Sequence, residues 1–208
     1  MATNNRGKLT EFRRLLAGVL VEVVSPADLG LEMEVDEDGL TFLANAQKKA
    51  REYANASGLP ALADDSGLVV RALGGRPGVQ SARYGGPGLD ERGRVQFLLN
   101  EMDGRADREA EFVCVLALAQ PGGPAAKVFM GRCGGRIGRH PVGEGGFGYD
   151  PVFVLPDGRT MAETPADEKD IVSHRGRAVA EMLSQLDVAR WAGQEGGAKG
   201  RVADNPSP

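Results

Sequence analysis

The sequence predicts an α/β protein with a long, curved sheet flanked by helices. Leu9, Phe12 and Leu16 recur at helical spacing near the start of the chain. Residues 111–119 and 127–137 instead have the composition of two long strands, joined by a proline- and glycine-rich turn at 121–124. The 208 residues suit one larger domain or two small lobes around a cleft.

The first half of the chain alternates between helical and extended patterns. A helix is expected after residue 8, a strand at 20–24 and an acidic loop at 35–39. Thr41 is a suitable cap for a long helix through about residue 56, which Gly58 would end. Short strands are expected at 61–63 and 68–73, followed by an ordered Gly/Pro/Arg-rich loop at 74–88.

The second half continues with a helix over 90–102 and then the two long strands. A glycine-rich segment at 141–150 leads to a short strand at 151–155, and Ser173 or His174 opens a last helix that reaches about residue 189. We therefore expect one domain over residues 1–190. Residues 191–208 have the composition of a disordered tail.

Composition excludes several classes of protein. The net charge of −4 argues against sequence-independent binding of nucleic acid, which needs a basic surface. Two cysteines without metal-ligand spacing argue against a thiolate zinc site, and two histidines exclude a multi-histidine metal site. The start of the chain is polar and no apolar run approaches the length of a membrane span, so a cytoplasmic protein is expected.

Asp64 and Asp65 lie between two apolar runs. Neighbouring side chains on a strand point to opposite faces, so one carboxylate could hold a metal ion while the other reaches a water or a second ligand. The repulsion between the two carboxylates implies Mg²⁺ or a Lys/Arg partner nearby. A polar turn between strands, followed by Gly67, is the alternative interpretation.

Two further stretches could contact phosphate. The segment from Thr3 to Lys8 leads into a helix, whose free N–H groups bind anions, although an Asn-rich helix cap would look the same. The acidic residues 36–38 could supply a carboxylate to Mg²⁺, with Lys48 and Lys49 on the following helix meeting phosphate oxygens. A solvated acidic loop with surface lysines is the alternative.

Two stretches could contact a flat ligand. Glycines on both sides free Phe147 to stack on such a ligand, and Asp150 would accept hydrogen bonds from a nucleobase edge. Lys169 and the segment Ser173-His174-Arg175 offer donors to a base carbonyl. A tight turn with an aromatic anchor and a salt-bridged helix start are the respective alternatives.

Taken together, these stretches resemble the inosine/xanthosine triphosphate pyrophosphatase family. The matching pieces occur in family order over about residues 1–186, which makes the set far more specific than any single piece. They include the segments Thr3-Asn4-Asn5-Arg6-Gly7-Lys8, Asp64-Asp65-Ser66-Gly67, Gly145–Pro151 and Ser173-His174-Arg175-Gly176. Family members have an apolar strand before the Thr-Asn loop. Here the loop begins at residue 3, so that strand is expected to be missing or a remnant.

The resemblance implies two lobes around a central cleft with a long mixed sheet, and usually a homodimer. It also implies Mg²⁺-dependent hydrolysis of dITP, ITP or XTP to the monophosphate and pyrophosphate. A pyrophosphatase for modified pyrimidine triphosphates and a non-catalytic nucleotide-binding module are the alternatives.

The resemblance also assigns roles to individual residues. It implies that Asp65 is the general base and also contacts the metal, with Glu37 and Asp64 as further metal ligands. The implied triphosphate loop comprises Thr3, Asn4, Asn5, Arg6, Gly7 and Lys8, with Lys49 and Ser66 as additional contacts. The implied base pocket comprises Phe147, Gly148, Tyr149, Asp150, Lys169, His174 and Arg175. Such a pocket would reject the 6-amino group of ATP, which leaves buried donors unpaired; the exclusion of GTP has no explanation in the sequence.

Overall fold

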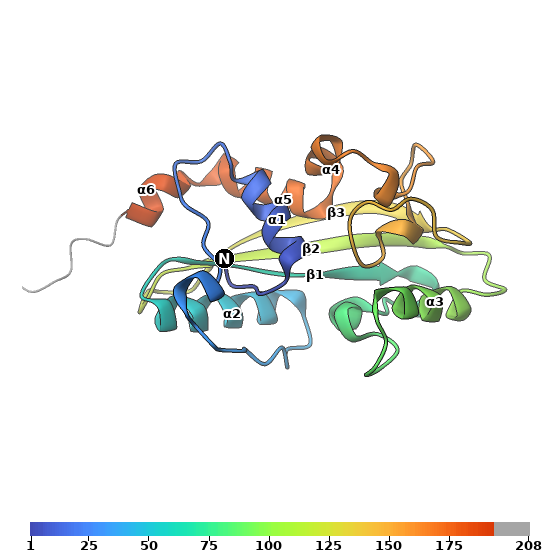
Figure 1. The fold of residues 1–208 in the computed structure, drawn as a ribbon, viewed down its shortest axis with the longest axis horizontal. Coiled ribbons are helices and arrows are strands. Elements are labelled where there is room, and N and C mark those ends of the chain that lie inside the picture. The colour runs from blue at the N-terminus through green and yellow to red at the C-terminus, as the bar shows by residue number, and fades with distance from the viewer. Residues whose placement is uncertain (194–208) are drawn as a thin grey trace, which may run out of the picture.

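One four-stranded sheet organises the chain in the computed structural model, which describes residues 1–193. Its strands are β1 (Ala61–Val70), β2 (Glu109–Ala119), β3 (Lys127–Ile137) and β4 (Phe153–Val154), in the order β1-β2-β3-β4 (Figure 1). Every pairing is antiparallel, so within the described residues the sheet is not the mixed one expected. A short connection, residues 120–126, joins β2 to β3. So short a connection permits only antiparallel pairing, whereas parallel strands need a long crossover.

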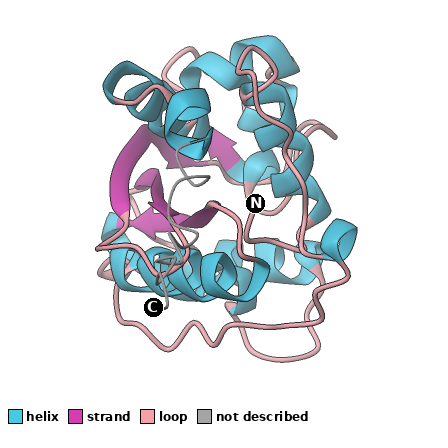
Figure 2. Cartoon of the chain, turned by 90° about the vertical axis from the view of Figure 1, so that its left-hand side faces the viewer, coloured by secondary structure: helices cyan, strands magenta, loops and turns pink. Residues whose placement is uncertain are grey.

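Helices cover both faces of the curved sheet (Figure 2). In Figure 1, α2 and α3 lie below the strands, whereas α1, α4 and α5 lie above them. The helices are α1 (Arg6–Leu15), α2 (Phe42–Ser57), α3 (Glu91–Glu101), α4 (Ala166–Val172), α5 (His174–Gln185) and α6 (Val188–Gly193). Buried apolar clusters fill the layers between the helices and the sheet. Within residues 1–193 no helix has the length and hydropathy needed to cross a membrane.

The cap of α2 matches the sequence signals, and α3 begins at a cap of the same kind. The Thr41 hydroxyl accepts a hydrogen bond from the Ala44 N–H at 3.1 Å, and Gly58 ends α2 in the left-handed conformation with φ 66°. The Asp90 carboxylate accepts from the Gly93 N–H at 2.7 Å at the start of α3. Both helices are therefore confirmed, because their signals are local.

Strand β1 differs from the expected pair of short strands. It runs without interruption through Asp64, Asp65 and Gly67, each of which is paired with a residue of β2. Gly67 therefore makes no turn. A Cβ on Gly67 would lie 2.5 Å from the carbonyl oxygen of Gly78, so the glycine instead allows the segment 78–83 to pack directly on the strand.

Other boundaries also differ from expectation. Residues 20–24 form no strand, and Leu20 is 93% exposed, so this apolar run has no layer to join. Helix α5 ends at Gln185, and α4 precedes it where no helix was expected. The expected strand at 151–155 is only the two residues of β4, preceded by a 3₁₀ turn at Asp150–Val152.

The two ends of the described chain concern the expectations of a missing first strand and of a C-terminal tail. The Ala2 N–H donates to the Leu62 carbonyl at 2.8 Å, so the backbone before α1 lies beside β1 although it forms no assigned strand. Of the tail expected at 191–208, residues 191–193 belong to α6. The remainder, 194–208, lies outside the described residues.

Candidate active site

The start of α1 presents free amide groups and a lysine to one side of the sheet. Asn5 caps the helix, with its side-chain oxygen accepting from the Lys8 N–H at 3.0 Å, and the Thr3 hydroxyl accepts from the Asn5 N–H at 3.1 Å. The Lys8 ammonium lies 2.7 Å from the carboxylate of Asp64. Asn4 and Arg6 are exposed. The loop thus has the arrangement of a helix N-terminus that can receive an anion.

Asp64 is buried among hydrogen-bond donors. Its Oδ2 meets the Lys8 ammonium and the Ser66 hydroxyl, which donates at 3.1 Å, and the Nε of Arg175 lies 3.7 Å away. Its Oδ1 accepts from the Cys114 thiol at 3.1 Å. Burial would raise the pKa of Asp64, but the charges of Lys8 and Arg175 hold it well below its usual range. Asp64 is therefore a fixed anion that holds these two cations in place.

Asp65 faces the opposite side of β1. Its carboxylate accepts from the Asn45 amide at 3.2 Å and lies 3.3 Å from the Lys49 ammonium. Lys49 also donates to the Asp64 carbonyl at 2.8 Å and pairs with Glu37. Burial raises the pKa of Asp65 to about 6, and the nearby negative charge of Glu37 adds to the effect while Lys49 opposes it. Asp65 thus differs in chemistry from its sequence neighbour.

The three carboxylates expected at a metal separate into two places. Glu37 and Asp65 meet at Lys49, whereas Asp64 faces Lys8 and Arg175. Among the described residues no three His, Cys, Asp or Glu side chains form a group that could hold a metal. Two converging carboxylates nevertheless fit Mg²⁺, which binds one or two such groups and takes water and phosphate oxygens for the rest.

A cavity of about 240 Å³ brings together residues that are far apart in the sequence. It lies between the start of α1, the middle of β1, the start of α3 and the start of α5. Its lining includes Asn5, Lys8, Ser66, Phe112, Phe147, Gly148, Tyr149, Asp150, His174 and Arg175. Both the expected phosphate loop and the expected base pocket therefore contribute to one cavity.

His174 and Phe147 provide two rings beside this cavity. His174 is fully buried and stacks on Phe112 with ring centroids 4.7 Å apart. Burial, and then the charge of Arg175, lower the pKa of His174 well below 6.5, so the imidazole is neutral at pH 7. The Phe147 ring has Arg175 5.0 Å and Lys169 5.5 Å from its centre. Both rings can therefore contact a flat ligand next to cationic groups.

Comparison with known proteins adds an independent observation. The family model described as "Ham1 family" matches residues 1–185. The chain belongs to the Ham1 family.

Relatives and solved structures cover most of this Ham1-family chain. A protein of Desulfotalea psychrophila, named dITP/XTP pyrophosphatase, is 45% identical over 93% of this chain and 87% of its own. One of Syntrophobacter fumaroxidans with the same name is 50% identical, covering 92% and 83% respectively. The structure of a HAM1 protein from Coxiella burnetii superposes with a TM-score of 0.79 at 39% identity, covering 91% of this chain and 95% of that one.

Glu11 is a site residue of this Ham1-family chain that the sequence analysis missed. Its carboxylate lies 2.6 Å from the Lys169 ammonium and 3.0 Å from Arg175, and Lys169 in turn lies 2.7 Å from Asp150. Arg175 donates to the Ser66 hydroxyl at 2.7 Å. This buried network joins α1, α4, α5 and β1. The available signal was the spacing of Glu11 three residues after Lys8, which places both on one side of the helix.

The remaining expected residues have mainly supporting positions. The Tyr149 hydroxyl donates to the Ser81 carbonyl at 2.9 Å, and the Gly148 N–H donates to Glu91 at 3.1 Å. Gly7 lies against Phe147, because a Cβ there would be 2.8 Å from the ring. These contacts fix the 147–150 segment against α1 on one side and α3 on the other.

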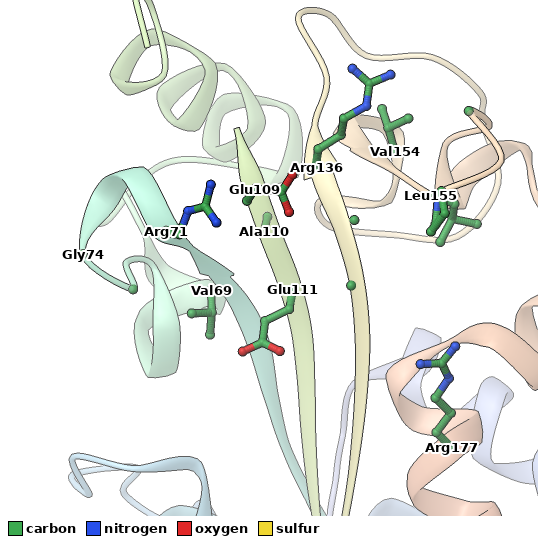
Figure 3. A pocket seen from close by; sticks show the side chains of 15 residues that line it. Val69, Arg71, Gly74, Glu109, Ala110, Glu111, Arg136, Val154, Leu155 and Arg177 are labelled. Atoms are coloured by element: carbon green, nitrogen blue, oxygen red, sulfur yellow. The ribbon is translucent and has the colours of Figure 1, made fainter. Parts of the chain in front are cut away.

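A second, larger cavity of about 990 Å³ lies elsewhere on the sheet (Figure 3). It is lined by β-strand residues, the 154–158 segment and Arg177, and it contains none of the expected site residues. Two of its charged groups already have partners, because Arg71 pairs with Asp107 at 2.7 Å and Glu111 with Arg132 at 2.6 Å. The smaller cavity is therefore the better candidate for the active site of this Ham1-family chain.

Proposed function

We propose that this chain hydrolyses non-standard purine nucleoside triphosphates, namely dITP, ITP and XTP, to the nucleoside monophosphate and pyrophosphate. The observation that carries the proposal is that β1 places two neighbouring carboxylates in different surroundings. Asp64 faces Lys8 and Arg175, while Asp65 faces Lys49 and Glu37 on the other side of the strand. The names of relatives that are 45% and 50% identical support the same activity.

The triphosphate would bind at the start of α1. Its charge suits the free amide groups of the helix and the ammonium of Lys8, which Asp64 holds in place. Asn5 and Lys8 line the cavity, so their groups are available to a ligand there. Thr3, Asn4, Arg6 and Gly7 belong to the same loop and are proposed as its further substrate contacts.

Asp65 would act on the attacking water. A carboxylate with a pKa of about 6 is mostly ionised at neutral pH and is still basic enough to accept a proton. The Asn45 amide and the Lys49 ammonium fix its orientation. We assign Asp64 the different role of anchoring Lys8 and Arg175, since its side chain is fully buried and surrounded by donors.

Glu37 and Asp65 are the residues that would hold Mg²⁺. When bound, the ion would neutralise phosphate charge and stabilise the leaving pyrophosphate. Lys49, which touches both carboxylates, balances their charge and would also reach a phosphate oxygen.

The purine would occupy the part of the cavity near α5. Arg175 in the cavity lining provides cationic donors, and Lys169 lies 5.5 Å from the centre of the Phe147 ring. The buried His174 provides a neutral ring, and Phe147 provides an aromatic face. Donors of this kind suit a 6-oxo group and leave the 6-amino group of adenine without an acceptor.

The test is pyrophosphate release from dITP, XTP, GTP, ATP and a panel of modified pyrimidine triphosphates, with Mg²⁺ and with EDTA. We expect metal-dependent turnover of dITP and XTP. Asp65→Asn should lower kcat by about 10²- to 10⁴-fold, because a general base is lost. The matched control is Asp103→Asn, which changes an exposed acid outside the cavity and should leave the rate unchanged.

Two other outcomes correspond to the alternatives. A strong preference for a pyrimidine would replace the purine assignment, and tight binding of nucleotide without turnover would indicate a non-catalytic binding module. Wild-type rates from Asp65→Asn would remove Asp65 from the reaction.

A homodimer and a cytoplasmic location complete the proposal. Both come from the family resemblance and the sequence. Light scattering on the purified chain measures the first, and cell fractionation measures the second.

A further inference from the structure

Arg94 of α3 lines the active-site cavity without a partner. Within the described residues it takes part in no ion pair and no side-chain hydrogen bond, and its Nε is buried with nothing to donate to. A buried donor without an acceptor is costly and therefore rare. The other cavity arginine, Arg175, is held by Glu11 and Ser66. The Nε of Arg175 also lacks a hydrogen-bond partner, but among the described residues that line the cavity Arg94 is the arginine whose side chain has no partner at all. All of its donors therefore remain available to a ligand.

The position of Arg94 relates it to the base end of the cavity. Glu91, one turn earlier on α3, also lines the cavity and accepts a hydrogen bond from the Gly148 N–H at 3.1 Å. Tyr149 lines the same cavity as Arg94. Helix α3 therefore contacts the 147–150 segment, and in Figure 1 it lies on the other side of the sheet from α1 and α5.

We propose that Arg94 determines specificity by recognising the 2-position of the purine. The inference rests on the proposed function, in which donors on α4 and α5 take the 6-oxo group. A base held there can turn a different edge toward α3, and position 2 is where xanthine, hypoxanthine and guanine differ.

The hydrogen-bonding chemistry at position 2 distinguishes the three bases. A guanidinium has donors only. Xanthine presents a 2-oxo acceptor, which pairs with Arg94. Hypoxanthine presents a hydrogen atom and neither gains nor loses a hydrogen bond. Guanine presents a 2-amino donor, which meets the donors of Arg94 and leaves both groups unpaired inside the cavity. One side chain would therefore favour XTP, tolerate ITP and disfavour GTP.

The experiment compares kcat/KM for XTP, ITP and GTP in the wild type and in Arg94→Met, which keeps the aliphatic stem and removes every donor. We expect the XTP/ITP ratio to fall about 10- to 100-fold, the range for a lost hydrogen bond to a charged group. We expect ITP turnover to change by less than about 3-fold and the GTP/ITP ratio to rise. Arg92→Met is the matched control, because Arg92 lies on the same helix but is exposed and outside the cavity lining.

Folding and the proposed function are checked separately. Thermal melting shows whether Arg94→Met folds, and Arg94→Gln, which retains a polar group, replaces it if it does not. Binding of xanthosine and inosine monophosphates, measured by calorimetry, tests Arg94 even if the wild type turns over none of the triphosphates, a result that would overturn the proposed function alone. An unchanged XTP/ITP ratio, together with an unchanged preference between the two monophosphates, would overturn the role of Arg94. An equal loss of kcat/KM for XTP and ITP would also overturn the role of Arg94.

Discussion

Two adjacent aspartates behave as different chemical groups because their side chains leave the strand on opposite faces. Asp64 has its carboxylate oxygens enclosed by Lys8, Ser66 and Cys114, and its pKa is held low. Asp65 and Glu37 pair with the same lysine, Lys49, and the pKa of Asp65 is raised to about 6. The environment of each carboxylate, more than its position in the sequence, therefore decides which one can exchange a proton.

His174 is buried and His140 is exposed, so the two histidines allow the effect of burial on stability to be tested at a single residue. Burial and the charge of Arg175 lower the pKa of His174 well below 6.5, so the unfolded chain binds this proton more readily than the folded chain. Its contribution to stability is complete above about pH 6.5 and is lost as the pH falls below that value. We expect His174→Gln to flatten the decline of the free energy of unfolding between about pH 6.5 and pH 5, measured by urea denaturation.

His140 is the matched control, since it is exposed. His140→Gln should follow the wild-type curve over the same range. Equal slopes for the wild type and His174→Gln would contradict a buried, neutral His174.

At the scale of elements, glycines set how closely α5 lies to its neighbours. A Cβ on Gly131 of β3 would overlap the carbonyl oxygen of His174, and a Cβ on Gly176 would overlap that of Asp170 at the end of α4. The backbones of these elements are therefore in direct contact. This contact places His174 and Arg175 at the cavity.

Gly131→Ala should push α5 away from β3. We expect a loss of about 2–3 kcal/mol in the free energy of unfolding, as for other overpacked interiors, together with a higher KM for dITP. Gly134→Ala on the same strand should change stability by less than about 0.5 kcal/mol, because a Cβ there would meet nothing within 4 Å. Chemical denaturation and steady-state kinetics measure both; equal effects of the two substitutions would argue against the close packing of α5.

The elements that could be predicted from sequence were those with local signals. Helices α2 and α3 have caps that can be read within four residues. Strand β2 is a long apolar run, and buried and exposed residues alternate along much of β3. Strand β1 was predicted as two pieces because Asp, Ser and Gly are turn residues. It stays continuous because Lys8, Lys49 and Arg175, all distant in sequence, neutralise its buried acids.

The candidate site shows the same limit of sequence-based prediction. Motifs that resembled a known family contribute Lys8, Ser66 and His174 to the lining of one cavity, whereas Glu37, Lys49 and Asp65 lie outside that lining. Glu11 and Arg94 were missed, since a single charged residue on a helix looks like a solvated one until its surroundings are known. Their roles depend on contacts or on unpaired atoms that only the fold reveals.

For the molecule as a whole, Glu11 connects the proposed phosphate side of the site to the proposed base side. Its two oxygens meet Lys169 of α4 and Arg175 of α5, while its backbone belongs to α1. The three side chains are nearly fully buried, so solvent weakens the pairs little. The arrangement therefore ties α1, α4 and α5 to one another beside the cavity.

Glu11→Gln should therefore affect both stability and function. We expect a loss of about 1.5–3 kcal/mol in the free energy of unfolding, the range for hydrogen bonds to charged groups, together with weaker discrimination between dITP and dATP. Differential scanning calorimetry and the substrate panel measure the two effects. Glu22→Gln, at an exposed position with no ion pair among the described residues, should change neither. Wild-type stability and selectivity in Glu11→Gln would show that the network is not needed.

The continuous strand β1 has a consequence for how the gene can vary. Because side chains alternate along a strand, inserting or deleting one codon before Asp64, within the stretch paired with β2, would shift the register and exchange the faces of the two aspartates. Asp64, which pairs with Lys8, would then face α2. Asp65, which faces Glu37, would instead lie among the cations on the other side of the strand. A point substitution in β1 changes one side chain. A change of one residue in the length of the strand moves both aspartates to the opposite faces. Length variants should therefore accumulate in turns such as 121–124 and be purged from the first half of β1.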